Sequence, residues 1–146
     1  MAEERRRVLL ADGSKIFRML LSLAMEAKDY DVRTVSSAHS ALFALTGCSF
    51  DVLVVDMDLP DIEGLELVRR VRAAGVSTPA IILGSNEDCA MVSAAADVET
   101  VVACPRTGNV HKLLPLIKGA CEHGELRADR SMTRAALSGP AAKTIS

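Results

Sequence analysis

The chain has 146 residues, of which 49% are apolar and 25% charged, and its formal net charge is −2. This length and balance are typical of one globular domain with a substantial core. The small negative charge argues against binding to nucleic acid, and no apolar stretch is long enough to cross a membrane. The charged N-terminus runs directly into an apolar stretch, so we expect no signal peptide and a cytoplasmic location.

Short apolar runs alternate along the chain with segments of helical period. Ser14 is available to cap the first helix, and the last helix must accommodate Pro115. The run at 51–56 is continuously apolar, as expected for a strand that is covered on both faces. Strands are expected at 7–12, 31–35, 51–56, 79–83 and 100–104, and helices at 16–24, 36–47, 65–75, 87–96 and 109–121.

Five successive strand–helix pairs predict an α/β fold in which helices cover both faces of a parallel sheet. Strands of this length fit a flavodoxin-like, doubly wound five-stranded sheet with strand order 2-1-3-4-5. We expect one domain over residues 1–121. Residues 122–146 lose the apolar period, and we expect them to form an extension that is partly helical or disordered.

Two acids, Asp12 and Asp56, end the first and third strands. In a sheet of this order, ligands bind beyond the carboxyl ends of the strands, at the point that these two strands flank. The two carboxylates should therefore converge, and oxygen ligands of this kind suit Mg²⁺. An aspartate held in this way can also attack a phosphoryl donor. Alternatively, both acids are solvated or cap the following helices, although Ser14 and Asp61 could provide that capping; spacing alone favours neither interpretation.

The segment DVLVVDMDLPDIEGLELVRRVR (51–72) resembles the phosphoacceptor strand, loop and following helix of the receiver domains of bacterial two-component response regulators. VLLADGSKIFRMLL (8–21) is similar to the first strand and helix of the same domains, with Asp12 as the first residue of their acidic pair. The resemblance covers residues 7 to about 121 and is greatest to the single-domain, chemotaxis-type members.

This resemblance implies a role for several residues of the acidic segment. Asp56 would be the phosphoacceptor. Asp12, Asp56 and the backbone carbonyl of Asp58 would be the ligands of a Mg²⁺ ion. Pro60 and Gly64 match the loop residues of the family.

The chain departs from the family pattern around these acids. Gly13 stands where the family has its second acid, which weakens the expected metal site. Gly84 stands in the register of the Thr or Ser that contacts the phosphoryl group, and Ser85, one position later, could reach that group instead. Cys104 replaces a Lys that precedes proline, and Val101 occupies the aromatic switch position.

Phosphoryl transfer depends on cations and donors placed where negative charge accumulates, so these losses should impair the site. Removing one such donor typically costs ~3 kcal/mol at a reacting centre. Lys15 and Arg106 are candidates for replacing the lost charge, but we expect both to be exposed loop cations. We expect Cys104 to be an inert, partly buried thiol rather than a redox-sensitive one.

Two signalling functions, neither of them enzymatic, remain open. The first is an atypical receiver that accepts a phosphoryl group at Asp56 from a sensor histidine kinase or phosphotransfer protein and acts on a downstream protein partner. The alternative is a pseudo-receiver, a docking module that keeps the fold without the phosphorylation. A catalyst or nucleotide binder of flavodoxin-like fold is disfavoured, because ADGSK (11–15) is too short for a phosphate-binding loop and lacks its glycine pattern.

Overall fold

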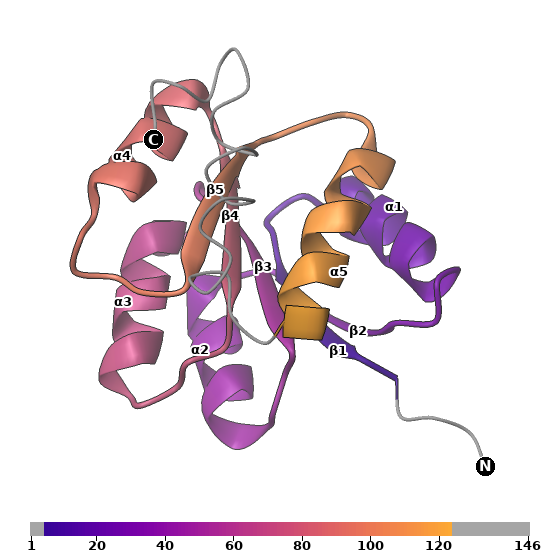
Figure 1. Ribbon diagram of the computed structural model, residues 1–146, viewed down its shortest axis with the longest axis horizontal. Helices are drawn as coiled ribbons and strands as arrows, with labels where there is room; N and C mark the ends of the chain where they lie inside the picture. Colours follow the sequence, from indigo (N-terminus) through magenta and orange to yellow (C-terminus); the bar gives the residue numbers. More distant parts are fainter. Residues whose placement is uncertain (1–4, 124–146) are drawn as a thin grey trace.

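Five parallel strands form one sheet in the order β2-β1-β3-β4-β5. The computed structural model describes residues 5–123 (Figure 1), so nearly all of the expected C-terminal extension lies outside the described residues. The predicted strand order is confirmed. The strands are β1 (Arg7–Ala11), β2 (Asp31–Val35), β3 (Val52–Asp56), β4 (Ala80–Gly84) and β5 (Val101–Pro105).

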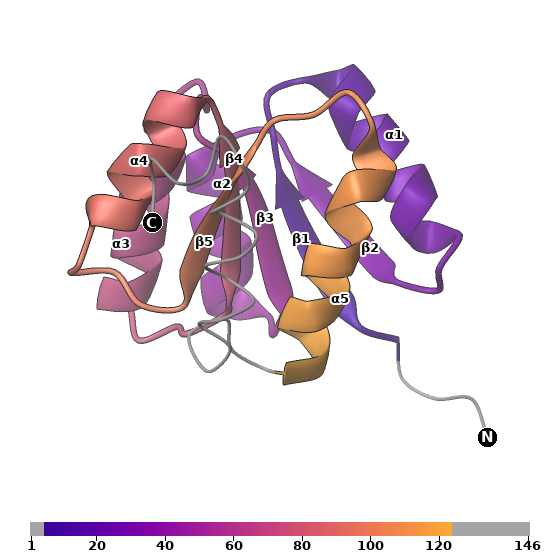
Figure 2. The same cartoon turned by 45° about the horizontal axis from the view of Figure 1, so that its top comes forward.

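Helices lie on both faces of this sheet, as the alternation of elements predicted. One face carries α1 and α5, and the other carries α2, α3 and α4 (Figure 2). The helices are α1 (Lys15–Glu26), α2 (Ala38–Gly47), α3 (Gly64–Ala73), α4 (Asn86–Ala94) and α5 (Leu114–His123), with a 3-10 turn η1 (Val110–Leu113) before α5. This is the doubly wound, flavodoxin-like architecture. Among residues 5–123, no helix is long and apolar enough to cross a membrane.

The burial of the strands follows from their position in the sheet. Every residue of β3 and β4 is buried, because both strands are interior to the sheet and covered on both faces. β2 lies at one edge, and its residues are exposed or only partly buried. The continuous apolar run at 51–56 was therefore a correct indication of a central strand, whose last residue is Asp56.

The last helix differs from the prediction in its start. We expected one helix over 109–121, but the structure has a 3-10 turn followed by α5, which begins at Leu114. Pro115 is thus the second residue of α5. In the first turn of a helix a backbone N–H has no helical partner, so proline costs little there.

The two side chains expected to cap helices, Ser14 and Asp61, differ in outcome. Ser14 caps α1, and its hydroxyl accepts the backbone N–H of Phe17 at 3.2 Å, as predicted. Asp61 does not cap the helix that follows it. Its carboxylate instead accepts the backbone N–H groups of Ala38 and His39, at 2.9 and 2.8 Å, and so caps α2 from the loop after β3.

Candidate functional site

Asp12 and Asp56 meet at the carboxyl edge of the sheet. β1 and β3 are neighbours whose register pairs Ala11 with Val55, so the residues that follow in each strand lie side by side. Asp12 is 0% exposed and Asp56 is 9% exposed. Two carboxylates buried this closely need a positive charge or a proton between them, because burial of an unpaired charge is costly.

The guanidinium group of Arg106 provides that charge. Its Nη1 lies 2.9 Å from Asp12 Oδ2, and its Nη2 lies 3.1 Å from Asp12 Oδ1. The same Nη1 lies 3.2 Å from Asp56 Oδ1. Arg106 and Lys15 are both exposed, as expected. Arg106 is nevertheless not a free loop cation, because it pairs with both acids. The sequence named Arg106 as a candidate for the lost charge but did not show that it reaches the acids.

Contacts on two further sides hold Arg106 in place. Its backbone N–H donates to the carbonyl of Gly84 at 2.9 Å, which extends the pairing of β4 and β5 by one residue. Its guanidinium stacks over the ring of Phe17, with Cζ 4.4 Å from the ring centroid, a cation–π arrangement. The hydrogen bond to Asp12 raises the pKa of Arg106, so the group stays charged.

The carboxylate of Asp56 is held by one oxygen only. Its Oδ1 accepts the backbone N–H of Asp58 at 3.1 Å as well as the contact from Arg106. Within residues 5–123, Oδ2 accepts no hydrogen bond. Burial raises the pKa of Asp56, and the charge of Asp12 adds to this rise; the Asp58 N–H and the Arg106 charge oppose it.

Gly13 and Gly84, the two glycines at which the sequence departs from the expected family pattern, have different surroundings. Gly13 is exposed, and a Cβ there would meet only Cδ of Pro60, at an ordinary 3.8 Å. At Gly84 a Cβ would lie 2.6 Å from Oδ2 of Asp88. A side chain can therefore be added at position 13 without a clash, but not at position 84 unless Asp88 moves.

Asp88 occupies the space at Gly84 because it forms a capping box with Ser85 at the start of α4. The Ser85 hydroxyl accepts the backbone N–H of Asp88 at 3.0 Å, and the Asp88 carboxylate accepts the N–H of Ser85 at 2.9 Å. One lone pair of the Ser85 hydroxyl is thus in use, and within residues 5–123 its proton is donated to no acceptor. Its contact with a phosphoryl group stays a prediction.

Cys104 is half-buried, and this burial raises the pKa of its thiol. A thiol that remains protonated is a poor nucleophile, which supports the expectation of an inert residue. All four cysteines of the chain are free thiols.

The groups at this edge, in their present arrangement, do not fit a Mg²⁺ ion. Both oxygens of Asp12 bond to Arg106, and Oδ1 also accepts the N–H of Ser14 at 2.8 Å. Over residues 5–123, no group of three or more His, Cys, Asp and Glu side chains is placed to hold a metal ion. The missing acid at Gly13 and the guanidinium between the carboxylates account for the misfit.

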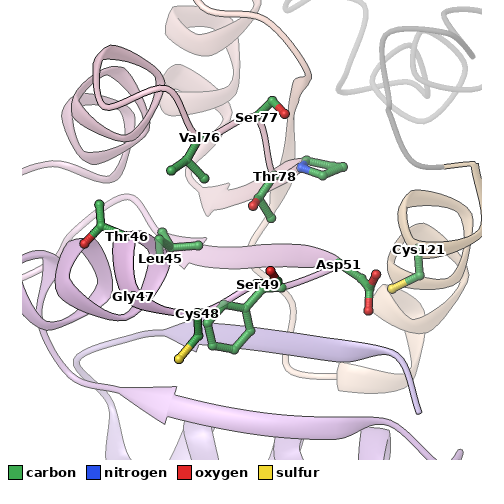
Figure 3. A pocket seen from close by; sticks show the side chains of 12 residues that line it. Leu45, Thr46, Gly47, Cys48, Ser49, Asp51, Val76, Ser77, Thr78 and Cys121 are labelled. Carbon is green, nitrogen blue, oxygen red and sulfur yellow. The ribbon is translucent and has the colours of Figure 1, made fainter. Parts of the chain in front are cut away.

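A pocket of about 560 Å³ lies elsewhere, near the start of β3 and β4 (Figure 3). It is lined by the segments 45–51 and 76–79, which precede these strands, and by Cys121 of α5. Asp56 is the last residue of β3, so this pocket is at the opposite edge of the sheet from the acids. It has no part in the site described above.

Comparison with known proteins places the chain in a family. The model of the response regulator receiver domain matches residues 8–115, and the chain belongs to this family of two-component signalling modules. The transcriptional regulatory protein TrcR of Mycobacterium tuberculosis is 36% identical over 81 residues, which are 56% of this chain and 32% of TrcR. The virulence transcriptional regulatory protein PhoP of Salmonella typhimurium is 32% identical over 81 residues, 56% of this chain and 36% of PhoP. The chain thus spans about a third of the length of these relatives.

Solved structures agree with this assignment. The chemotaxis response regulator CheY4 of Vibrio cholerae has a TM-score of 0.67 and 25% identity, with 80% of this chain and 99% of that chain covered. The response regulator TrrA of Thermotoga maritima, solved in complex with Mg(2+)-BeF, has a TM-score of 0.68 and 24% identity, with 79% and 98% covered. The expected fold and family are confirmed. The roles predicted for individual residues stay predictions.

Proposed function

We propose that this receiver domain accepts a phosphoryl group at Asp56 from a sensor histidine kinase or phosphotransfer protein and signals to a downstream protein partner. The supporting observation is the state of the Asp56 carboxylate at the end of β3. It is buried beside a cation, one oxygen is fixed by Arg106 and the Asp58 N–H, and the other oxygen has no hydrogen bond within the described residues.

The proposed reaction transfers a phosphoryl group from an oxygen or nitrogen atom of the donor to a carboxylate oxygen of Asp56. Oδ2 of Asp56 forms a bond to phosphorus as the bond between phosphorus and the donor atom breaks, and the donor atom leaves with the electron pair. A positive charge beside the reacting oxygens lowers the cost of the negative charge that they carry. Arg106 supplies such a charge next to Oδ1.

The cofactor expected from the family is Mg²⁺, held by Asp12, Asp56 and the carbonyl of Asp58. For this ion to bind, Arg106 would have to leave Asp12, because it occupies both of its oxygens. We therefore propose that any Mg²⁺ site here is weak. No step of the transfer needs to be assigned to the ion.

A second candidate function is a pseudo-receiver that docks to its partner without phosphorylation. The ion pairs of Arg106 favour it, because they neutralise the acids in the resting protein. The carboxylates are then less available to a further cation or to a phosphoryl group. In this case the signalling surface would be constitutive.

Incubation of the protein with acetyl phosphate distinguishes the two functions. We expect intact-mass spectrometry to show one added phosphoryl group on the wild type and none on Asp56→Asn. Asp29→Asn, which removes an exposed acid from the turn before β2, is the control and should still be labelled. If the wild type gains no mass, the receiver function is contradicted and the docking function is favoured.

A further inference from the structure

The space between the Asp12 and Asp56 carboxylates is filled by a side chain of the protein itself. We propose that Arg106 is the resident cation of this site and takes the place that a divalent ion would need. This assignment of the resting site does not depend on phosphorylation. Its extension, that the same guanidinium faces the incoming phosphoryl group, rests on the proposed function.

The first argument is the charge of the site. Asp12 is fully buried, and a buried carboxylate without a partner costs several kcal/mol. Arg106 gives it a bidentate partner at 2.9 and 3.1 Å, the geometry in which a guanidinium binds a carboxylate best. A Mg²⁺ ion at this place would have to replace both contacts and the third contact to Asp56.

The second argument is that Arg106 is also held by contacts with residues other than the two acids. Its ring partner Phe17 is 8% exposed and belongs to α1, whereas the Arg106 backbone is tied to β4 through the carbonyl of Gly84. A contact with α1 thus supports the side chain, and a contact with β4 fixes the backbone that carries it. The ring contact restricts the rotation of the guanidinium before the ion pair forms, which lowers the entropic cost of that pair.

The third argument concerns the positions that could have provided a further metal ligand or another cation. Gly13 brings no carboxylate, although the backbone has room for one. Lys15 is exposed, and no ion pair joins it to Asp12 or Asp56 in the described part of the chain. The site therefore has two buried acids and one built-in cation. A third acid, Asp58, is exposed, and among residues 5–123 no three such side chains are placed to hold a metal ion.

Titration with Mg²⁺ tests the assignment directly. The signals of the Arg106 guanidinium and of the Asp12 and Asp56 carboxylates are followed by NMR in the 146-residue chain. We expect no saturable change in the wild type at millimolar Mg²⁺. In Arg106→Gln we expect binding at least about tenfold tighter, the change that a competing interaction of only ~1.4 kcal/mol would produce. Arg70→Gln, which removes an exposed arginine of α3, is the charge-matched control and should behave as the wild type.

Binding of Mg²⁺ to the wild type as tight as to Arg106→Gln would overturn the proposal. If Arg106→Gln does not fold, the wild type alone decides: guanidinium signals that Mg²⁺ leaves unchanged support the assignment, and signals that it shifts contradict it. A second arm labels the wild type with acetyl phosphate in EDTA and in Mg²⁺. Equal labelling supports the role of Arg106 toward the phosphoryl group, and labelling that requires Mg²⁺ overturns that role. If the protein is labelled in neither condition, the proposed function is contradicted. The assignment of Arg106 as the resident cation is then tested by the Mg²⁺ titration alone.

Discussion

Gly64, the first residue of α3, lies directly against the backbone of Asp56. A Cβ at position 64 would lie 2.6 Å from the Asp56 carbonyl oxygen, and the Gly64 N–H donates to the carbonyl of Met57 at 2.9 Å. The end of the loop between Asp56 and α3 thus packs against the backbone at its start. Only glycine, which has no Cβ, permits this close approach.

We expect Gly64→Ala to lower the free energy of unfolding by ~1–3 kcal/mol, the usual cost of forcing atoms into a packed site. The clash is with backbone, which cannot move aside without shifting Asp56. Urea denaturation measures the loss. Gly47→Ala is the matched control, because a Cβ at this last residue of α2 meets nothing within 4 Å. Equal stabilities of the two variants would contradict the steric argument.

Asp61 stabilises the start of α2, and its removal should have a pH-dependent cost. The N–H of Ala38, followed by that of His39, lowers the pKa of Asp61. Its contribution is therefore present above the unfolded value of about 3.9 and is lost as the pH falls through the folded pKa. We expect Asp61→Ala to cost ~0.5–2 kcal/mol at neutral pH, as for other caps. Asp61→Asn keeps an acceptor oxygen, so it should cost less and show no such pH dependence in urea melts.

The charge of Asp56 should act against folding. Burial raises its pKa, so the folded protein holds this proton more tightly than the unfolded chain. The contribution of Asp56 to the free energy of unfolding therefore falls as the pH rises from about 3.9 through the folded pKa. We expect Asp56→Asn to melt at a higher temperature than the wild type at neutral pH, with no difference in acid. Asp29→Asn, at an exposed turn residue, is the control and should melt as the wild type does. A lower melting temperature for Asp56→Asn would show that the ionised carboxylate is net stabilising.

The cysteines should differ in their reactivity toward iodoacetamide. Burial raises the pKa of Cys89 to about 11 and that of Cys121 to about 12, and it also raises that of Cys104. Cys48 is exposed. In the native protein at mildly alkaline pH, mass spectrometry should find Cys48 alkylated first and the other three protected. In denaturant all four should react alike; rapid native labelling of Cys104 would instead favour the redox-sensitive interpretation.

The sequence was sufficient for the architecture but not for the contacts between loops. Alternating strand and helix periods, with a continuously apolar run before Asp56, predict a central parallel strand because periodicity reports which faces are covered. The ion pair of Arg106 with Asp12 joins residues 94 positions apart. It depends on the direction that the chain takes after β5, and no local pattern encodes that direction.

The same limit applies to the cap that Asp61 provides. From the sequence, an acid shortly before an apolar helix indicates a cap for that helix. In the structure the loop turns Asp61 toward α2, whose first N–H groups are 22 and 23 residues away in sequence. For the last helix, the sequence indicated that Pro115 must be accommodated, but it did not predict that η1 would precede α5.

The distance in sequence between Arg106 and the acids has a consequence for folding. Asp12 and Asp56 are brought together when β1 pairs with β3, but their counter-charge follows β5, the last of the five described strands to be synthesised. A nascent chain that ends before residue 106 must either leave this edge open to water or hold protons on its acids. Docking of β5 on β4 is therefore the step that brings the counter-charge to this edge, so the charge balance beside β1 and β3 is completed by the C-terminal part of the domain.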